Sequence, residues 1–269
     1  MRIAATVQYN GKGFSGFQIQ NDARTVQGEL ERSLSTYFRV AIRVHAAGRT
    51  DAGVHSYGQV VHFELPEQQK FSDAELTKII HSANCILPAD VSFVYAKVVS
   101  DEFHARFSCT GREYVYQVLR SDYRLALFND THLWIRDFVD VQKMRESAKC
   151  LIGEHDFASF TRHVYSQSGE TTVRRLDKLI ITEADPFYSI YFSGSGFLHN
   201  MIRIITGALL NVGLGKWDPL EVNKILLEKS RIHEGVTFPA HPLTFVNARY
   251  KDYKTPENLI PGYDTMTSG

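Results

Sequence analysis

Two segments near the start of the chain, RIAATVQY at residues 2–9 and TVQGELERSLSTYF at residues 25–38, predict the first elements of the fold. In the first segment, apolar side chains stand at every second position, as they do on one face of a β-strand. In the second segment, apolar residues recur at helical spacing, and Thr25 is a suitable N-cap. A glycine-rich stretch separates the two. The chain is therefore expected to begin with a strand, a turn and a helix.

Further elements are predicted as far as about residue 100. Alternating apolar residues indicate a second strand at residues 42–44 and a third at residues 60–65. Ser72 and Glu75 have capping-box spacing at the start of a second helix, and residues 91–99 have a strand pattern. The order strand, helix, strand, strand, helix, strand is that of the split βαβ unit of ferredoxin-like folds.

A second, longer series of elements follows the first. Strands are expected at residues 114–119, 133–135, 179–182, 188–192 and 244–250, and helices at residues 140–151, at residues 199–212 and from Asp218 onward, with caps at Asp140 and Asp218. The tail after residue 250 contains two prolines and few apolar residues, so we expect it to be irregular.

These patterns predict an α+β fold made of two fused ferredoxin-like halves. We expect residues 1–107 to form the N-terminal half, residues 108–250 the C-terminal half and residues 251–269 the tail. Two such halves placed edge to edge would give a mixed, mainly antiparallel sheet, with helices on one face and an open cleft on the other. A cleft of this kind can hold an extended polyanion.

The composition is balanced and excludes few functions. The 30 basic and 30 acidic residues give a net charge of zero, so an RNA-binding surface would have to be a local patch. Cys85, Cys109 and Cys150 form neither a CxxC pair nor a disulfide framework, which favours a reducing compartment. No apolar run approaches the roughly 20 residues that span a bilayer, and the first residues lack the apolar core of a signal peptide. We therefore expect a cytoplasmic protein.

The sequence predicts neither a dinucleotide-binding loop nor a metal site. Gly11, Gly13 and Gly16 match GxGxxG after a strand, but helical periodicity starts only near Val26. A dinucleotide loop needs a helix that begins at the loop, so we interpret these glycines as a turn. The eleven histidines are dispersed and HExxH is absent, so we expect no metal site and interpret His62, on a predicted strand, as structural.

The segment GRTDAGVH at residues 48–55 lies in the loop that joins the second and third strands. Taken alone, an arginine beside an aspartate in a glycine-flanked loop is more often a turn with a local ion pair. Together with the GQVVHFE that follows, however, the segment closely resembles the signature of the tRNA pseudouridine synthase A family. Other segments resemble that family in the same order along the chain, at residues 17–20, 103–108, 114–116 and 197–203.

The resemblance implies catalytic roles for three residues. Asp51 corresponds to the catalytic aspartate, an ionised nucleophile that attacks either C1′ of the ribose or C6 of the uracil. Arg203 is expected to pair with Asp51 and favour its charged form; a surface arginine is the alternative, but its helix is largely apolar. Tyr114 is expected to stack on the uracil and assist removal of the C5 proton, although an aromatic residue on a strand is otherwise core packing.

Five further residues are expected to contact the RNA. Arg49, two residues before the catalytic aspartate, is expected to fill the gap left by an everted uridine or to hold its phosphate. Gln18, His55 and His199 are expected to line the RNA channel, and Arg106 to contribute to a basic patch.

The substrate and assembly that the resemblance implies are a tRNA, modified at uridines 38, 39 and 40 of the anticodon stem-loop, and a homodimer without cofactor. Two alternatives stay open: a pseudouridine synthase acting on other RNAs, and a non-catalytic tRNA-binding protein or chaperone. The sequence departs from the family at Glu113, where a basic residue is usual, at Pro242, where glycine is expected, and at Phe17, where tryptophan is frequent. Glu113 would weaken a phosphate contact.

Overall fold

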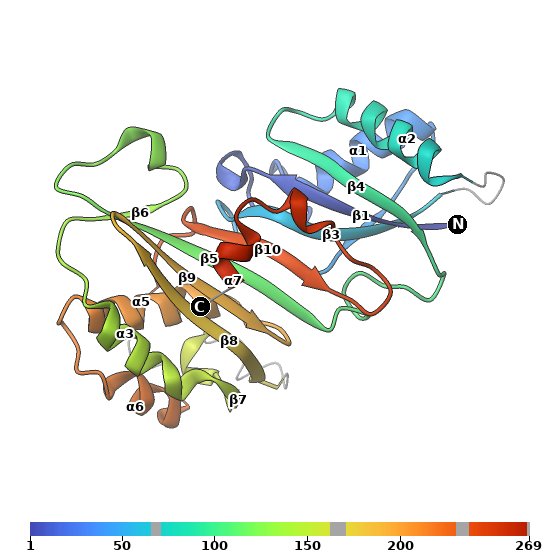
Figure 1. Cartoon of the computed structure of the whole chain (residues 1–269). Helices are drawn as coiled ribbons and strands as arrows, with labels where there is room; N and C mark the ends of the chain where they lie inside the picture. Colours follow the sequence, from blue (N-terminus) through green and yellow to red (C-terminus); the bar gives the residue numbers. More distant parts are fainter. Residues whose placement is uncertain (66–70, 162–170, 230–236, 268–269) are drawn as a thin grey trace. The chain divides into compact units, whose positions relative to one another are not determined.

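The computed structural model describes residues 1–65, 71–161, 171–229 and 237–267. The chain forms two compact units (Figure 1). The first unit contains Met1–Gly111 and Thr244–Tyr263, and the second contains Arg112–Leu243 and Asp264–Gly269. The segment from residue 244 to residue 250, which the sequence assigned to the C-terminal half, therefore groups with the first unit.

The first unit has the order of elements that the sequence predicted. Its elements are β1 (Arg2–Tyr9), α1 (Val26–Phe38), β2 (Val44–Ala46), β3 (His55–Glu64), α2 (Asp73–Ile86), β4 (Val91–Val99) and β10 (Leu243–Arg249). β1 pairs with β3 and β4, and β2 pairs with β3, all antiparallel. The resulting strand order, β4-β1-β3-β2, is that of a ferredoxin-like sheet. β10 joins the opposite end of β3 in parallel.

Helices α1 and α2 begin at the caps that the sequence indicates, and both cover one face of this sheet (Figure 1). The Thr25 hydroxyl accepts from the Gly28 N–H, and Ser72 and Glu75 form a reciprocal capping box. Apolar side chains of alternate β1 positions share one buried core with residues of both helices. This packing removes the amphipathic faces from water and fixes the sheet.

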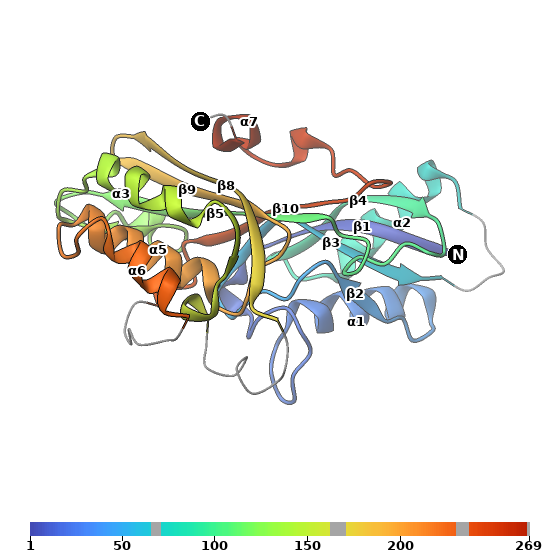
Figure 2. The same ribbon diagram turned by 90° about the horizontal axis from the view of Figure 1, so that it is seen from below.

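The other face of the first unit is partly covered by the tail, which the sequence left as irregular and unplaced. The Tyr253 hydroxyl lies 2.8 Å from the Thr6 hydroxyl, and the Thr255 hydroxyl lies 2.9 Å from the same group. The Gln8 side-chain amide donates to the Leu259 carbonyl. Figure 2 shows the segment after β10 and helix α1 on opposite sides of the strands. The tail therefore covers this face of the sheet at β1, where Thr6 and Gln8 lie.

The second unit contains a second group of paired strands, with helices. Its elements are β5 (Gly111–Arg120), β6 (Leu133–Ile135), α3 (Val141–Ala148), β7 (Gly153–Asp156), β8 (Val173–Ala184), β9 (Phe187–Gly194), α5 (Met201–Gly213), α6 (Glu221–Glu228) and α7 (Tyr263–Thr267). The order β5-β9-β8-β7 is antiparallel throughout, and β6 runs parallel to β5. The α+β class and the mixed, mainly antiparallel pairing predicted from the sequence are confirmed.

Several boundaries differ from the sequence-based expectation, and two of them have local reasons. β3 begins at His55 rather than Val60, because its first residues find partners in β1 and β10. α6 begins at Glu221 rather than at the proline after Asp218. Asp218 instead closes a turn, in which its carbonyl accepts from the Glu221 N–H and its carboxylate accepts from the Leu220 N–H. Within the described residues, no helix is long and apolar enough to cross a membrane.

Candidate active-site residues

Asp51 stands at the first position of a tight turn in the loop between β2 and β3. Its carbonyl accepts from the Val54 N–H at 3.2 Å, and Gly53, the third residue of the turn, has φ +83°. A turn with positive φ at its third position favours glycine. The side chain of Asp51 is half-buried. The GRTDAGVH pattern therefore encodes a turn that fixes the backbone of Asp51.

The glycine-rich turn after β1 packs directly on this loop. A Cβ at Gly11 would lie 2.0 Å from the Val54 carbonyl oxygen, and one at Gly16, where φ is +96°, would lie 3.0 Å from the Thr50 oxygen. The Phe17 N–H donates to that same Thr50 oxygen at 3.0 Å. These glycines allow two backbones to approach closely. They form a turn, as predicted from the sequence, and the structure shows that this turn supports the Asp51 loop.

Polar side chains anchor the loop on both sides of Asp51. The Tyr9 hydroxyl lies 2.8 Å from the Thr50 hydroxyl in a buried environment, and the Gln59 side-chain amide donates to the Gly48 carbonyl at 2.9 Å. Burial raises the pKa of Tyr9 to about 12, so its hydroxyl stays protonated and can donate. Sequence analysis missed Tyr9 and Gln59, because each contacts the loop through tertiary pairing of β1 and β3.

His55 is placed inside the first unit rather than on its surface. Its side chain is 6% exposed, and its Nδ1 accepts from the Gly11 N–H at 3.1 Å. This hydrogen bond ties the glycine-rich turn to the start of β3. The position favours a structural role, and the contact of His55 with RNA stays a prediction.

Tyr114 lies on β5 in the second unit, opposite Phe192 of β9. It is 7% exposed, and its ring makes an edge-on contact with Phe197, with ring centroids 5.3 Å apart. Tyr116, two residues further on, donates its hydroxyl to the Pro239 carbonyl at 3.0 Å. Burial raises the pKa of Tyr116, against a smaller opposing effect of the nearby Arg203. Tyr116 is thus engaged structurally.

Arg203 lies in the first turn of α5 and is held by neighbours of its own unit. Its Nη1 donates to the Asn200 side-chain oxygen at 2.9 Å, and its Nε donates to the Phe238 carbonyl at 2.7 Å. Asn200 adopts a left-handed backbone at φ +62°, which asparagine tolerates better than most residues, and its side chain does not cap the helix. The guanidinium is therefore oriented by two hydrogen bonds and half-buried, and its pairing with Asp51 stays a prediction. Asn200 and Phe238 were not found from sequence.

The remaining predicted RNA-binding residues are on the surface of their units. The side chains of Gln18, Arg49, Arg106 and His199 are exposed. Their contacts with RNA stay predictions, and surface exposure is the condition that such contacts require.

The structure places the three residues that depart from the family pattern. Phe17 is buried against Tyr9, with ring centroids 6.3 Å apart. Glu113 is 3% exposed on β5, so it does not present its carboxylate on an open surface. The Pro242 carbonyl accepts from the Gln117 N–H at 3.0 Å. The effect of Glu113 on a phosphate contact stays a prediction.

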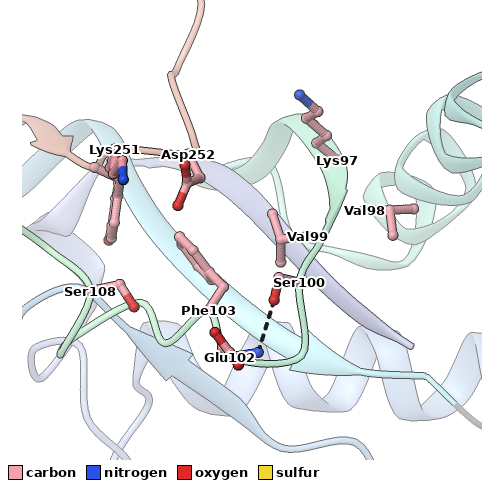
Figure 3. A pocket seen from close by; sticks show the side chains of 10 residues that line it. Lys97, Val98, Val99, Ser100, Glu102, Phe103, Ser108, Lys251 and Asp252 are labelled. Carbon is pink, nitrogen blue, oxygen red and sulfur yellow. Dashed lines mark hydrogen bonds between the residues drawn. The ribbon is translucent and has the colours of Figure 1, made fainter.

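A pocket of about 330 Å³ lies at the end of the first unit's sheet that is distant from Asp51 (Figure 3). Lys97, Phe103, Ser108, Tyr250 and Lys251 are among its lining residues. β1 connects the two ends: its first residue pairs at the pocket end, and its last residue, Tyr9, reaches the Asp51 loop. The pocket is therefore not the site of the Asp51 chemistry. Within the described residues, no group of three or more His, Cys, Asp or Glu side chains could hold a metal ion.

Comparison with known proteins decides the family. A family model described as tRNA pseudouridine synthase matches residues 5–108 and 147–251. The chain belongs to the tRNA pseudouridine synthase family. Three relatives of this family, each named tRNA pseudouridine synthase A, come from Leptospira biflexa, Nitrosomonas eutropha and Shewanella sediminis. They are 37%, 39% and 38% identical to this chain, respectively. The alignments cover 93%, 93% and 96% of this chain and 94%, 88% and 96% of the relatives. Membership of this pseudouridine synthase family makes the chain an isomerase.

Proposed function

We propose that this chain converts uridine to pseudouridine in tRNA, at positions 38, 39 and 40 of the anticodon stem-loop, with Asp51 as nucleophile. Its family membership and the names of its relatives support tRNA as the substrate. The observation that carries the catalytic assignment is the Asp51 turn, whose backbone is fixed by Gly53 and by the glycine-rich turn. A carboxylate held in this way can attack without a cofactor or metal.

The proposed reaction needs no redox partner. The bond from ribose C1′ to uracil N1 breaks, the base turns, C1′ bonds to C5, and the C5 proton is removed while N1 gains a proton. Asp51 stabilises the intermediate by bonding to C1′ or to C6. We propose that Arg203 favours the ionised form of Asp51, and that Tyr114 stacks on the uracil and takes part in the final proton transfer.

The target uridine has to leave its stack, at a cost of a few kcal/mol. We propose that Arg49 fills the vacated space or holds the phosphate, since its side chain is exposed two residues before Asp51. Gln18, His55, Arg106 and His199 are proposed to contact the RNA.

The decisive experiment replaces the nucleophile without changing its shape. Asp51→Asn is expected to abolish pseudouridine formation in unmodified tRNA transcripts while tRNA affinity is kept. Asp22→Asn is the matched control, because Asp22 is exposed and has a positive φ that asparagine tolerates. Turnover by Asp51→Asn at the rate of the control would refute the assignment.

Two other functions are separated by the same assay. A non-catalytic tRNA-binding protein or chaperone would bind tRNA and leave its uridines unchanged. A synthase with other targets would form pseudouridine in a mixture of transcripts but not in tRNA. Intact Asp51, Tyr114 and Arg203 favour catalysis, because binding a polyanion gains nothing from a carboxylate in the binding site.

We propose a cytoplasmic homodimer, with the segment from residue 121 to residue 138 of the second unit as the contact between copies. This segment exposes large apolar side chains: Tyr123, Leu125, Leu127, Trp134 and Phe138. It also carries three aspartates and two arginines, a balance that suits a second copy related by a two-fold axis and does not suit RNA. Sedimentation equilibrium tests this, and a monomer across the micromolar range would contradict it.

A further inference from the structure

Four rings, here called the ring row, lie in contact on the first unit; His62 is buried, whereas His45 and Phe107 are exposed. His45 and His62 are stacked with ring centroids 4.9 Å apart and planes at 20°. His62 and His104 follow at 4.6 Å, and His104 and Phe107 at 4.4 Å with planes at 35°. The row ends at Phe107, which is 77% exposed. An exposed phenylalanine at the end of a row of rings is not required by the packing of the core.

The ring row lies on the sheet face that α1 and α2 leave uncovered. His62 on β3 stands opposite Ala4 of β1 and His45 of β2. Thr6, two residues beyond Ala4 on the same face of β1, contacts the tail rather than the helices. Helices and ring row are therefore on opposite faces of the sheet.

Hydrogen bonds to three side chains hold the loop that carries Phe107. His104 Nδ1 accepts from the Arg106 N–H at 3.1 Å, and His62 Nδ1 accepts from the Ala105 N–H at 3.1 Å. The Tyr250 hydroxyl donates to the Ala105 carbonyl at 2.6 Å. Phe103 of the same loop is buried and turned toward the pocket, as Figure 3 shows. Phe107 is thus exposed on an ordered loop, which lowers the entropy lost when a partner binds it.

The charge around the ring row suits a nucleobase beside a phosphate backbone. Burial and the neighbouring imidazoles lower the pKa of His104 and lower that of His62 to about 3, so both rings are neutral at pH 7. The Arg106 guanidinium carbon lies 5.7 Å from the centre of the Phe107 ring. Rings of this kind flanked by arginine bind single-stranded nucleic acid by stacking on its bases.

We propose that Phe107 stacks on an unpaired base of the bound RNA, at a contact separate from the target uridine. The inference rests on the proposed function, since it takes tRNA as the ligand. The distance between the ring row and the Asp51 loop follows from β1. Ala4 lies beside the ring row, and Tyr9, five residues further along the strand, contacts the Asp51 loop. At about 3.4 Å per residue this is about 17 Å along the sheet. Phe107 is thus a positioning residue, which holds the RNA without touching the reacting atoms.

The test compares Phe107→Ala, Phe107→Leu and Phe107→Trp in the full-length enzyme with unmodified tRNA. Stacking on one base predicts that Ala and Leu both weaken tRNA binding about 5- to 100-fold, whereas Trp restores it. The single-turnover rate at saturating enzyme is expected to stay at the wild-type value. The slope of log affinity against log salt is expected to stay unchanged, because no phosphate contact is lost. Leu227→Ala, at an apolar residue that is 68% exposed on α6, is the control.

The possible outcomes separate this inference from the function on which it rests. If wild type modifies tRNA but Phe107→Ala binds equally well, the stacking contact is wrong and the function stands. If Phe107→Leu binds like wild type, the contact is apolar and not stacking, which also overturns the inference. A change of oligomeric state in Phe107→Ala would assign the ring to a second copy of the chain. If wild type neither binds nor modifies tRNA, the proposed function fails before the variants are compared.

Discussion

Gly11→Ala tests whether the glycine-rich turn positions Asp51. An added Cβ would lie 2.0 Å from the Val54 carbonyl oxygen, at the end of the Asp51 turn. An ordinary carbon–oxygen contact is about 3.3 Å, so the two backbones have to separate by about 1.3 Å. A displacement of about 1 Å at a reacting group costs about 100-fold in rate. We therefore expect turnover to fall by about two orders of magnitude.

The same substitution also destabilises the first unit, so stability has to be measured separately. Overpacking of this kind costs about 1–3 kcal/mol, which corresponds to about 2–4 °C in melting temperature per kcal/mol. Gly58→Ala provides the control, because its Cβ would lie 2.4 Å from the Val246 oxygen of β10. Both variants should have a lower melting temperature than wild type, but only Gly11→Ala should lose turnover at a temperature where both are folded. Equal turnover of the two folded variants would refute the positioning role.

Two further predictions concern Arg203 and the histidines. Asn200→Gly keeps the left-handed backbone but removes the side-chain oxygen that accepts from Arg203 Nη1. Turnover should therefore fall about 10-fold or more, with tRNA affinity unchanged. Undiminished turnover would show that this hydrogen bond does not orient the guanidinium. The pKa of His62 is lowered to about 3 in the folded protein. Below about pH 6.5 the unfolded chain therefore binds a proton at His62 that the folded chain does not bind. The folded state loses stability as the pH falls from about 6.5 toward 3. Melting temperatures at pH 7.5 and 4.5 should therefore differ more for wild type than for His62→Asn, whose side-chain oxygen can still accept from Ala105; equal differences would contradict the assignment.

The sequence predicted the local structure well because its signals act within one helical turn. The caps Thr25, Ser72 and Asp140 each accept a hydrogen bond from a backbone N–H three residues ahead, as the sequence indicates. Where such a signal has two solutions, the prediction was wrong. Aspartate is a common N-cap residue, but Asp218 closes a turn before α6.

The sequence by itself determined most of the elements, the ferredoxin-like order of the first unit and the segment that carries Asp51; it missed β7 and the short helix α7 in the tail. Only the tertiary structure decided how that segment is held. The contacts of Gly11 with Val54 and of Tyr9 with Thr50 join residues about forty positions apart, and no local pattern encodes them. The grouping of β10 with the first unit and the ring row that ends at Phe107 have the same origin. Caps and alternation follow from backbone geometry over a few residues, whereas supports and binding surfaces arise when distant strands pair and bring their side chains together.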